Sequence, residues 1–518
     1  MKKISSYLSG LFLALVLLSL FRPGMEVRAQ EAAGKTEENT ARYQTVEELK
    51  GKKIAVLADS GFDLLLDEAM DTKNEYAYFS AYTDMLAALD AGRVEAASLD
   101  EPVAELAVHA NTGLAIVPEA VMTVEYGIAF PKGSPLTAKF DPVIEQFRED
   151  GTLDALKEKW MGADESKKVL ITQDWPGENG TIRYYHDATY SPMCYIGNGG
   201  ESAGYDLDLV LMIARELDVK LEMTVCNFDS LIPAIQSGKA DVVSGCMDIT
   251  EERKKNVDFS VPYYDGAVVF VVESTAAVVE EGNMWTRLAD SFRGTFLVEG
   301  RWRLILDGLG VTLLISVLSG VIGLLLGFGL CMLRRMKNRP SQIITGMFVR
   351  IIQGMPIVVF LMILYYIIFG SIDISAIAVS VVGFSINFGA YTSEMMRSGI
   401  DAVDAGQSEA AYAMGYTRVQ TFWKIVFPQA AKHFLPVLKG EFISMVKMTS
   451  IVGYIAVQDL TKVSDIIRSR TMDAFFPLII TAVIYFVIAN LLTMVLSLIE
   501  RRVDPKRRKR VIKGVTMQ

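Results

Sequence analysis

Residues 409–428 read EAAYAMGYTRVQTFWKIVFP, and this polar, alanine-rich stretch decides the fold of the second half of the chain. Strongly apolar segments lie on both sides of it. The composition predicts a short helix in a cytoplasmic loop, ended where Pro428 removes a backbone donor. An ordinary alanine-rich surface helix is the alternative. The positions that form a pattern are Glu409, Ala410, Ala411, Gly415, Ile425 and Pro428.

The 518 residues are long enough for two or three domains. Hydrophobic residues make up 51% of the chain but are unevenly spread. Residues 31–280 are mixed and acidic, whereas residues 304–500 are dominated by long uncharged runs. The net charge of -10 therefore describes the soluble part and does not indicate binding to nucleic acid.

The N-terminus predicts export of the first half. Lys2 and Lys3 precede an apolar run, and Ala29 ends a plausible cleavage site. This is the layout of a signal peptide over residues 1–29, with an uncleaved anchor as the alternative.

The polar chemistry of the chain predicts neither a metal site nor a hydrolase. The four cysteines lack metal-ligand spacing and histidine neighbours; Cys226 and Cys246 either form a disulfide or stay as separate buried thiols. The three histidines belong to no nucleophile–base set, so no catalytic residue is predicted.

Five apolar segments are candidate membrane helices, because about 20 residues span a bilayer. The fourth is marginal, since it carries Lys439, Glu441 and Lys447. Ionisable residues at membrane depth usually face a bundle interior or a polar path. Glu394, Arg397, Glu441 and Lys447 are therefore pore candidates, unless they lie near the helix ends and reach water. The segments are Gly308–Leu333, Ile351–Ile372, Ile374–Ser393, Phe434–Gln458 and Ala474–Ile499.

Basic residues favour five spans over four. Arg334 and Arg335 follow the first segment, which places its end inside the cell if the preceding part is exported. The tail at residues 501–518 holds a second basic cluster, and five spans put it in the cytoplasm.

Residues of about 300–502 resemble the polar amino-acid permeases of ABC importers, the histidine/glutamine/glutamate type. The pattern E-A-A-x3-G-x9-I-x-F-P in residues 409–428 is similar to the loop with which such permeases dock onto an ATPase subunit. Ala390–Arg397 and Gly354–Pro356 also match, although Gln353 replaces the usual arginine. The resemblance implies about five membrane helices that work in pairs. No G-x-x-x-x-G-K-[ST] phosphate loop occurs in the chain, so ATP and Mg would be used by a separate subunit.

Residues 46–163 and 169–274 alternate strand-like and helix-like segments, which predicts α/β lobes. Residues 169–274 resemble the first lobe of solute-binding proteins for polar amino acids, family 3, through Asp248–Ser260 and neighbouring stretches. Residues 46–163 resemble the second lobe, so the lobes stand in reverse order. Either one chain forms a circularly permuted two-lobed domain, or half-domains pair between the subunits of a dimer.

An amino-acid ligand needs a cation for its carboxylate and an anion for its ammonium group. By resemblance, Arg253 clamps the carboxylate, which a guanidinium can hold through both oxygens. Asp100 in the other lobe takes the ammonium group. Ser60 stands at a helix N-terminus, where exposed amides favour an anion. The resemblance further assigns Tyr190 and Phe228 as aromatics around the ligand side chain and Asp187 as a polar contact.

Four of these assignments have a plainer alternative. Arg253 could bridge to a neighbouring glutamate, Asp100 could cap the following helix, and Tyr190 and Phe228 could be core residues. Asp248 departs from the family, which usually has a hydroxyl there. A carboxylate beside a carboxylate ligand is repulsive, so either the substrate carries an extra positive charge or the pocket has lost binding.

The sequence therefore predicts a two-lobed α/β domain like a periplasmic binding protein, followed by an all-α membrane domain. The expected function is an amino-acid importer with receptor and permease in one polypeptide of the cytoplasmic membrane. A ligand-gated channel or a sensor built from the same lobes is the alternative. Expected partners are a cytoplasmic ATPase, a second copy of the chain, an amino acid and membrane lipid. The expected domains are residues 1–29, 46–163, 169–274, a linker with a membrane-surface helix at 275–303, 304–500 and 501–518.

Overall fold

The computed structural model describes residues 41–58, 60–111, 113–162, 165–197, 200–275, 284–372 and 374–503, which form two compact units. The first unit contains the described residues up to Leu304 together with Ser464–Ile480. The second contains Ile305–Val463 and the residues from Thr481 onward. The expected signal peptide and the tail beyond residue 503 lie outside the described residues.

The first unit contains a six-stranded sheet in the order β2-β1-β3-β14-β4, with β5 paired to β14. The strands β1, β2 and β3 are parallel, and β14 runs antiparallel to its neighbours. We call this sheet and its helices lobe A. Its strands are β1 (Lys53–Leu57), β2 (Glu75–Phe79), β3 (Ala96–Asp100), β4 (Leu114–Ile116), β5 (Met122–Tyr126) and β14 (Tyr264–Glu273), and its helices are α2 (Phe62–Ala69), α3 (Tyr82–Asp90) and α4 (Glu101–Ala110).

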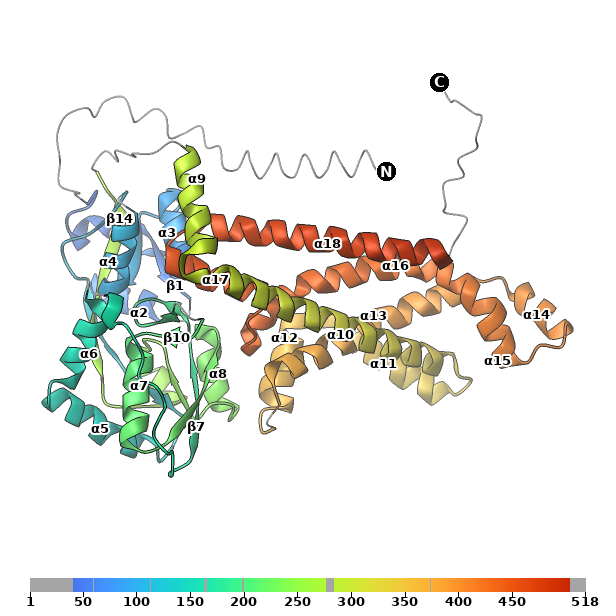
Figure 1. The fold of residues 1–518 in the computed structure, drawn as a ribbon, viewed down its shortest axis with the longest axis horizontal. Coiled ribbons are helices and arrows are strands. Elements are labelled where there is room, and N and C mark those ends of the chain that lie inside the picture. Colours follow the sequence, from blue (N-terminus) through green and yellow to red (C-terminus); the bar gives the residue numbers. More distant parts are fainter. Residues whose placement is uncertain are drawn as a thin grey trace, which may run out of the picture. The chain divides into compact units, whose positions relative to one another are not determined.

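A five-stranded sheet in the order β11-β7-β12-β6-β13 forms the centre of lobe B. A small sheet of β8, β9 and β10 adjoins it, and the helices group around these strands (Figure 1). The strands are β6 (Ala129–Phe130), β7 (Thr181–His186), β8 (Thr189–Tyr190), β9 (Cys194–Ile196), β10 (Ser202–Ala203), β11 (Lys220–Val225), β12 (Val242–Ser244) and β13 (Asp258–Phe259). The helices are α5 (Thr137–Glu149), α6 (Thr152–Met161), α7 (Tyr205–Glu216) and α8 (Leu231–Gln236).

The chain crosses between the lobes twice, from β5 to β6 and from β13 to β14. Each lobe therefore contains elements from both halves of the domain. The strand β14 lies inside the lobe A sheet, and α6 packs on lobe B, where Trp160 donates to Asp208 at 3.0 Å. Two adjacent crossings are the covalent arrangement that a hinge between lobes requires.

The second unit is helical, which confirms the predicted fold class of a two-lobed α/β domain followed by an all-α membrane domain. Of the described helices, α10, α13 and α18 are long and apolar enough to cross a membrane, and two bent pairs bring the number to five if each counts as one span. The helices after the lobes are α9 (Met284–Phe292), α10 (Trp302–Arg335), α11 (Arg339–Gly354), α12 (Ile357–Met362), α13 (Ala376–Asp401), α14 (Ala405–Ala413), α15 (Arg418–Thr421), α16 (Phe427–Met448), α17 (Leu460–Thr471) and α18 (Phe476–Val503).

Short helical turns complete the described elements. The 3-10 turns are Val46–Leu49, Glu165–Lys167, Phe228–Ser230, Arg253–Lys255, Val298–Gly300 and Thr449–Ile455. The π-helical turns are Arg293–Leu297, Ile363–Ile368 and Phe422–Val426.

The segment expected to span the membrane at residues 351–372 is broken into two helices and is not one straight helix. The helices α11 and α12 meet at an angle of 109°. Met355 is extended, with φ -103 and ψ 133, because a residue before proline is driven out of the α region. Pro356 itself precedes the first helical residue of α12. The Gly-Met-Pro motif therefore forms a bend.

Small residues bring α10 and α13 into close contact. A Cβ on Gly323 would lie 2.8 Å from the carbonyl oxygen of Ser385, and one on Gly327 would lie 2.8 Å from that of Gly389. Backbones that approach this closely are typical of helix association in membranes. Gly329, on the same helix, would place its Cβ in open space.

Candidate functional site

Asp100 is the carboxylate at which the two lobes meet. It ends β3 of lobe A, and its side chain makes no cap hydrogen bond with α4. Tyr126 of lobe A donates to Oδ1, and Tyr190 of lobe B donates to Oδ2. Burial raises the pKa of Asp100 to about 7, against which the hydrogen bond from Tyr126 acts. The group is thus held near the point where it exchanges its proton at neutral pH.

Arg253 is buried in lobe B and forms an ion pair with Asp248. Its Nη1 also donates to the backbone oxygen of Asp248 at 3.1 Å. The guanidinium lies 5.5 Å from the ring centre of Phe228, a cation–π distance. Glu251 pairs with Lys254, so its carboxylate is engaged away from the arginine. Arg253 and Phe228 are thus adjacent in lobe B.

Asp248 is only 3% exposed and uses one of its two oxygens. Oδ1 pairs with Arg253, whereas Oδ2 has no hydrogen-bond partner among the described residues. That second oxygen lies 4.0 Å from the position a Cβ would take on Gly61 of lobe A, so it faces the other lobe. Burial raises the pKa of Asp248, and the charge of Arg253 opposes this rise.

Ser60 and Asp187 are buried near the ends of their strands and satisfy local hydrogen bonds. The Oγ of Ser60 donates to Leu57 O at 2.7 Å and accepts from the backbone N–H of Phe62 at 3.2 Å. Asp187 accepts the hydroxyl of Thr189 at 2.6 Å. Both side chains thus stabilise the loops that carry them.

Two tyrosines at this site were missed from the sequence. Tyr126 binds Asp100 but stands 26 residues away in a strand with no motif around it. Tyr82 lies edge-on to Tyr190, with ring centres 5.6 Å apart. Its hydroxyl donates to the backbone oxygen of Ser469 at 3.0 Å. A chain of contacts thus leads from Ser469 through two tyrosines to Asp100.

The segment Ser464–Ile480 contacts both lobes. Arg468 forms an ion pair with Asp84 of lobe A, and its side chain is 5% exposed. Arg470 donates to the backbone oxygen of Ile196 in lobe B and lies 4.7 Å from the ring centre of Tyr195. Ile466 packs in a buried cluster with Ala188 and Ile196. Both lobes are therefore linked to the same short segment.

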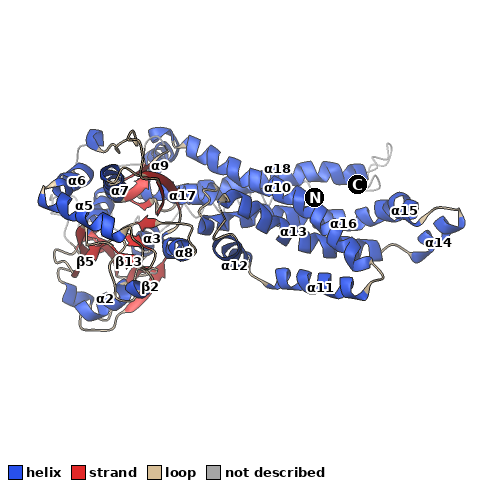
Figure 2. Cartoon of the chain, turned by 90° about the horizontal axis from the view of Figure 1, so that it is seen from below, coloured by secondary structure: helices blue, strands red, loops and turns tan. Residues whose placement is uncertain are grey.

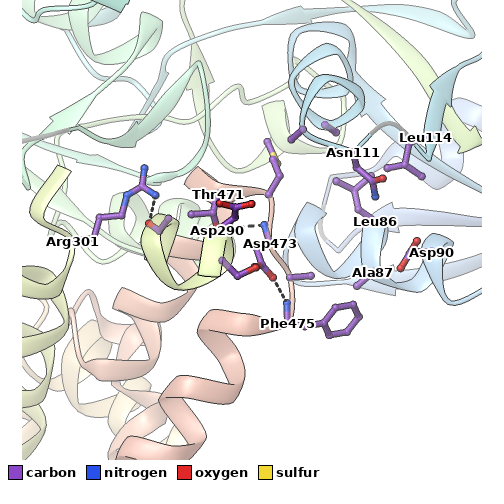
Figure 3. A pocket seen from close by; sticks show the side chains of 16 residues that line it. Leu86, Ala87, Asp90, Asn111, Leu114, Asp290, Arg301, Thr471, Asp473 and Phe475 are labelled. Carbon is purple, nitrogen blue, oxygen red and sulfur yellow. Dashed lines mark hydrogen bonds between the residues drawn. The ribbon is translucent and has the colours of Figure 1, made fainter. Parts of the chain in front are cut away.

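A separate cavity of about 580 Å³ lies in this unit, between α3, the end of α4, α9 and residues 471–475. Figure 3 shows Asp290, Asp473 and Arg301 on one side and Asp90 and Asn111 on the other. Arg301 donates to Gly294 O at 2.7 Å, and Asp473 accepts from the backbone N–H of Phe475 at 3.1 Å. The predicted ligand residues do not line this cavity.

The pore candidates Glu394 and Arg397 belong to an ion-pair network at the ends of α10 and α13. Glu394 pairs with Arg334 and, at 3.0 Å, with Arg397. Arg397 also reaches Asp401 at 3.3 Å. The network joins two helices at one end of the helical unit. It therefore has a structural role whether or not it lines a pore.

The other two pore candidates lie on α16. Glu441 is half-buried. Lys447 is exposed and lines a cavity of about 450 Å³ together with residues of α18. Nearby, Lys439 pairs with Glu500 of α18 at 2.8 Å.

Part of the polar stretch at residues 409–428 lies on two short helices at one end of the helical unit, beyond α13 and α16 (Figure 2). Glu409, Ala410 and Ala411 lie on α14, which Asp404 caps by accepting from Gly406 N–H at 2.7 Å. Gly415 follows with φ +83, a conformation that favours glycine. The exposed apolar side chains here are Tyr412, Met414, Val419 and Trp423.

Pro428 does not end a helix, so that expectation was wrong. It lies in the first turn of α16, where a missing N–H is tolerated. The π-helical turn Phe422–Val426, which includes Ile425, leads into α16 and links it to α15. Gln429 of α16 donates to Gln407 of α14 at 3.2 Å and so holds the two helices together.

All four cysteines are free and buried, so the disulfide alternative for Cys226 and Cys246 does not hold in this structure.

Comparisons with known proteins agree with this architecture. The model of bacterial extracellular solute-binding proteins, family 3, matches residues 182–432. The putative glutamine transport system permease protein GlnP of Rickettsia felis is 34% identical over 202 residues, which are 38% of this chain and 92% of that protein. The L-cystine transport system permease protein TcyB of Bacillus subtilis is 34% identical over 205 residues, which are 39% of this chain and 88% of that protein.

Among solved structures, a crystal structure of an amino acid ABC transporter with histidines is 38% identical, with a TM-score of 0.36, over 39% of this chain and 94% of that one. Because the chain covers nine-tenths of a permease relative at 34% identity, it belongs to the family of amino-acid ABC transporter permeases.

Proposed function

We propose that this chain is the receptor and permease subunit of an ATP-driven importer for polar amino acids. The observation that carries the proposal is a buried base in lobe B together with a buried acid in lobe A at which the two lobes meet. Arg253 lies in lobe B beside an aromatic ring, and Asp100 in lobe A is reached by Tyr190 of lobe B. A zwitterion needs one cation and one anion in this arrangement, sheltered from water. The similarity to permeases with amino acids in their names supports the same conclusion.

The receptor is a circularly permuted two-lobed domain formed within one chain. Two strands support this part of the proposal. The strand β14 follows the lobe B strands in the sequence but pairs in the sheet of lobe A, and β6 follows lobe A strands but pairs in the sheet of lobe B. Within this domain, Ser60, Asp187, Tyr190 and Phe228 shape the site around Arg253 and Asp100. Ligand binding closes the lobes about the two crossings.

The segment Ser464–Ile480 transmits lobe closure to the membrane helices. Its last residues, 476–480, are the beginning of α18, and its contacts with Asp84 and Ile196 reach one lobe each. A movement of one lobe relative to the other must break contacts on one side of the segment or carry it along. These contacts are sufficient for the proposed coupling between lobe closure and the membrane helices.

The membrane domain works with partners. A cytoplasmic ATPase binds the surface of α14 and α15, whose exposed apolar side chains and Glu409 suit a protein interface. A second copy of the chain completes the pore, and membrane lipid surrounds the five spans. The lobes lie outside the cell and the C-terminus lies in the cytoplasm, as the basic residues after α10 and α18 favour.

Affinity purification of the chain from membranes of its host tests the proposal. We expect an ATPase to co-purify and its ATP hydrolysis to rise on addition of a mixture of amino acids. Glu409→Lys should abolish co-purification, whereas Glu149→Lys, on an exposed part of lobe B, should not. A ligand-evoked ion current in planar bilayers without any ATPase would instead support the channel alternative.

A further inference from the structure

The residues predicted to contact the ligand carry an excess of negative charge. Three of them, Asp100, Asp187 and Asp248, are acids, and one, Arg253, is a base. Asp187 is held by Thr189, which leaves Asp100 and Asp248 on opposite lobes. The two carboxylates are close enough that the charge of Asp248 contributes to the raised pKa of Asp100. A neutral zwitterion adds no net charge and leaves this excess in a buried place.

The second carboxylate oxygen of Asp248, Oδ2, is the atom that can contact a ligand side chain. Oδ1 is paired with Arg253, while Oδ2 is buried without a hydrogen-bond partner in the described part of the chain and faces lobe A near Gly61. A buried carboxylate oxygen without a donor is costly, and native proteins rarely keep one without a functional reason. A donor that enters between the lobes can reach an oxygen that faces the other lobe.

We propose that the site between the lobes selects amino acids with a cationic side chain, and that Asp248 sets this selectivity by offering Oδ2 to the side-chain cation. The inference rests on the proposed function and adds the class of substrate to it. Asp248 then bridges two cations, Arg253 through Oδ1 and the ligand side chain through Oδ2. Arg253 remains the partner of the ligand carboxylate, and Asp100 remains the partner of its ammonium group.

The same geometry explains why a neutral ligand is disfavoured. A neutral amide or urea group can donate a hydrogen bond to Oδ2, but it leaves the negative charge of the site uncompensated. A cationic group adds the attraction between opposite charges to this hydrogen bond, and that attraction is stronger in a buried site than in water. A site with polar groups built for one ligand discriminates most strongly against an analogue that leaves those groups unpaired.

Arginine and citrulline isolate the charge, because a guanidinium and a urea have nearly the same shape. We would titrate the full-length chain in nanodiscs by calorimetry with L-arginine, L-citrulline, L-lysine and L-glutamine. We expect arginine to bind at least about tenfold more tightly than citrulline, which corresponds to about 1.4 kcal/mol. Lysine should also bind more tightly than glutamine.

Asp248→Asn keeps the shape of the side chain and removes its charge. We expect the ratio of arginine to citrulline affinity to fall to within about threefold, since the charge preference depends on this residue. Asp258→Asn is the matched control, because Asp258 pairs with Lys132 on the surface of the same lobe and should leave the ratio unchanged. If Asp248→Asn fails to fold, Asp248→Ser and the ratio in the unmodified chain decide the question.

The outcomes separate this inference from the proposed function. Tight binding of glutamine or citrulline, equal to or better than that of arginine, would overturn the cationic selectivity and leave amino-acid import standing. An unchanged ratio in Asp248→Asn would overturn the role of Asp248. A folded chain that binds no amino acid at all would overturn both.

Discussion

The phenol hydroxyl of Tyr190 in lobe B donates a hydrogen bond to Oδ2 of Asp100 in lobe A. The proposed partner of the ligand ammonium group is therefore also a direct polar link between the lobes. Tyr126 binds the other oxygen of the same carboxylate, but from within lobe A. Substitutions at the two tyrosines can therefore distinguish a hydrogen bond between the lobes, made by Tyr190, from one within lobe A, made by Tyr126.

Tyr190→Phe should make the lobes separate more readily in buffer without amino acids. A hydrogen bond to a charged group contributes about 1.5–3 kcal/mol, so the ratio of open to closed receptor should rise about tenfold or more. Fluorescence energy transfer between dyes on cysteines introduced at Glu68 and Arg215, exposed positions of lobes A and B, measures this ratio. The natural cysteines are all buried and should not react.

Tyr126→Phe serves as the control for that experiment. It removes a hydrogen bond from the same carboxylate without cutting a link between lobes, so it should leave the transfer efficiency nearly unchanged. Equal effects of the two substitutions would show that Tyr190 does not hold the lobes together.

Ligand affinity should increase with pH up to about 7 and then level off. Burial raises the pKa of Asp100 to about 7, and only the ionised carboxylate can pair with an ammonium group. Ligand binding must therefore release a proton at lower pH. We expect the association constant to rise by up to about tenfold per pH unit between pH 5.5 and 6.5. Calorimetry at four pH values, in two buffers of different ionisation enthalpy, measures both the slope and the proton release.

Asp100→Asn should lose most of this pH dependence. Burial also raises the pKa of Asp248, so Asp100→Asn combined with Asp248→Asn should remove what is left. An unchanged slope in Asp100→Asn would assign the titration to another group.

Arg468→Met should impair transport more than ligand binding. It breaks the ion pair with Asp84, whose side chain is 41% exposed, so we expect a loss of only about 1 kcal/mol, or fivefold, in the coupling of lobe closure to ATP hydrolysis. Affinity for the amino acid should stay within about threefold, because Arg468 does not contact the predicted ligand residues in the contacts described above.

Arg215→Met, on an exposed face of α7, removes an arginine that lies outside this segment and should change neither quantity. ATPase stimulation and calorimetric affinity, measured on the same nanodisc samples, separate the two effects. A parallel loss of both in Arg468→Met would mean that the segment only supports the fold of the lobes.

Gly327→Ala should destabilise the membrane domain, because its Cβ would lie 2.8 Å from a backbone oxygen of α13, which cannot move away alone. Overpacking of this kind costs about 1–3 kcal/mol. Gly329→Ala adds the same methyl group on the same helix in open space. The thermal midpoint in detergent should fall by several degrees for Gly327→Ala only; equal midpoints would contradict the close packing.

Local sequence patterns predicted the two classes of structure well, because hydropathy and strand–helix alternation act over short distances. The exact bends were not predictable in the same way. The sequence predicts that Pro428 ends a helix and that Pro356 lies within a span, but a proline is also compatible with the first turn of a helix or with the position just before it. Only packing decides between these positions, as the π-helical turn before α16 and the angle between α11 and α12 illustrate.

The sequence predicted the charged residues of the site but not the uncharged residues that contact them. Arg253 and Asp100 stand in recognisable stretches, whereas Tyr126 and Tyr82 become relevant only when distant segments meet. The pairing of Arg253 with Asp248 could not be foreseen either, since positions five residues apart in a loop leave the direction of each side chain undetermined.

The central claim is that this chain imports amino acids with the energy of ATP. Uptake of radiolabelled amino acids into proteoliposomes that contain the chain and its ATPase tests it most directly. We predict accumulation above the external concentration that requires ATP on the cytoplasmic side and falls at least about tenfold in Arg253→Ala. Equilibration of amino acids or ions without ATP, or uptake unchanged in Arg253→Ala, would contradict the account.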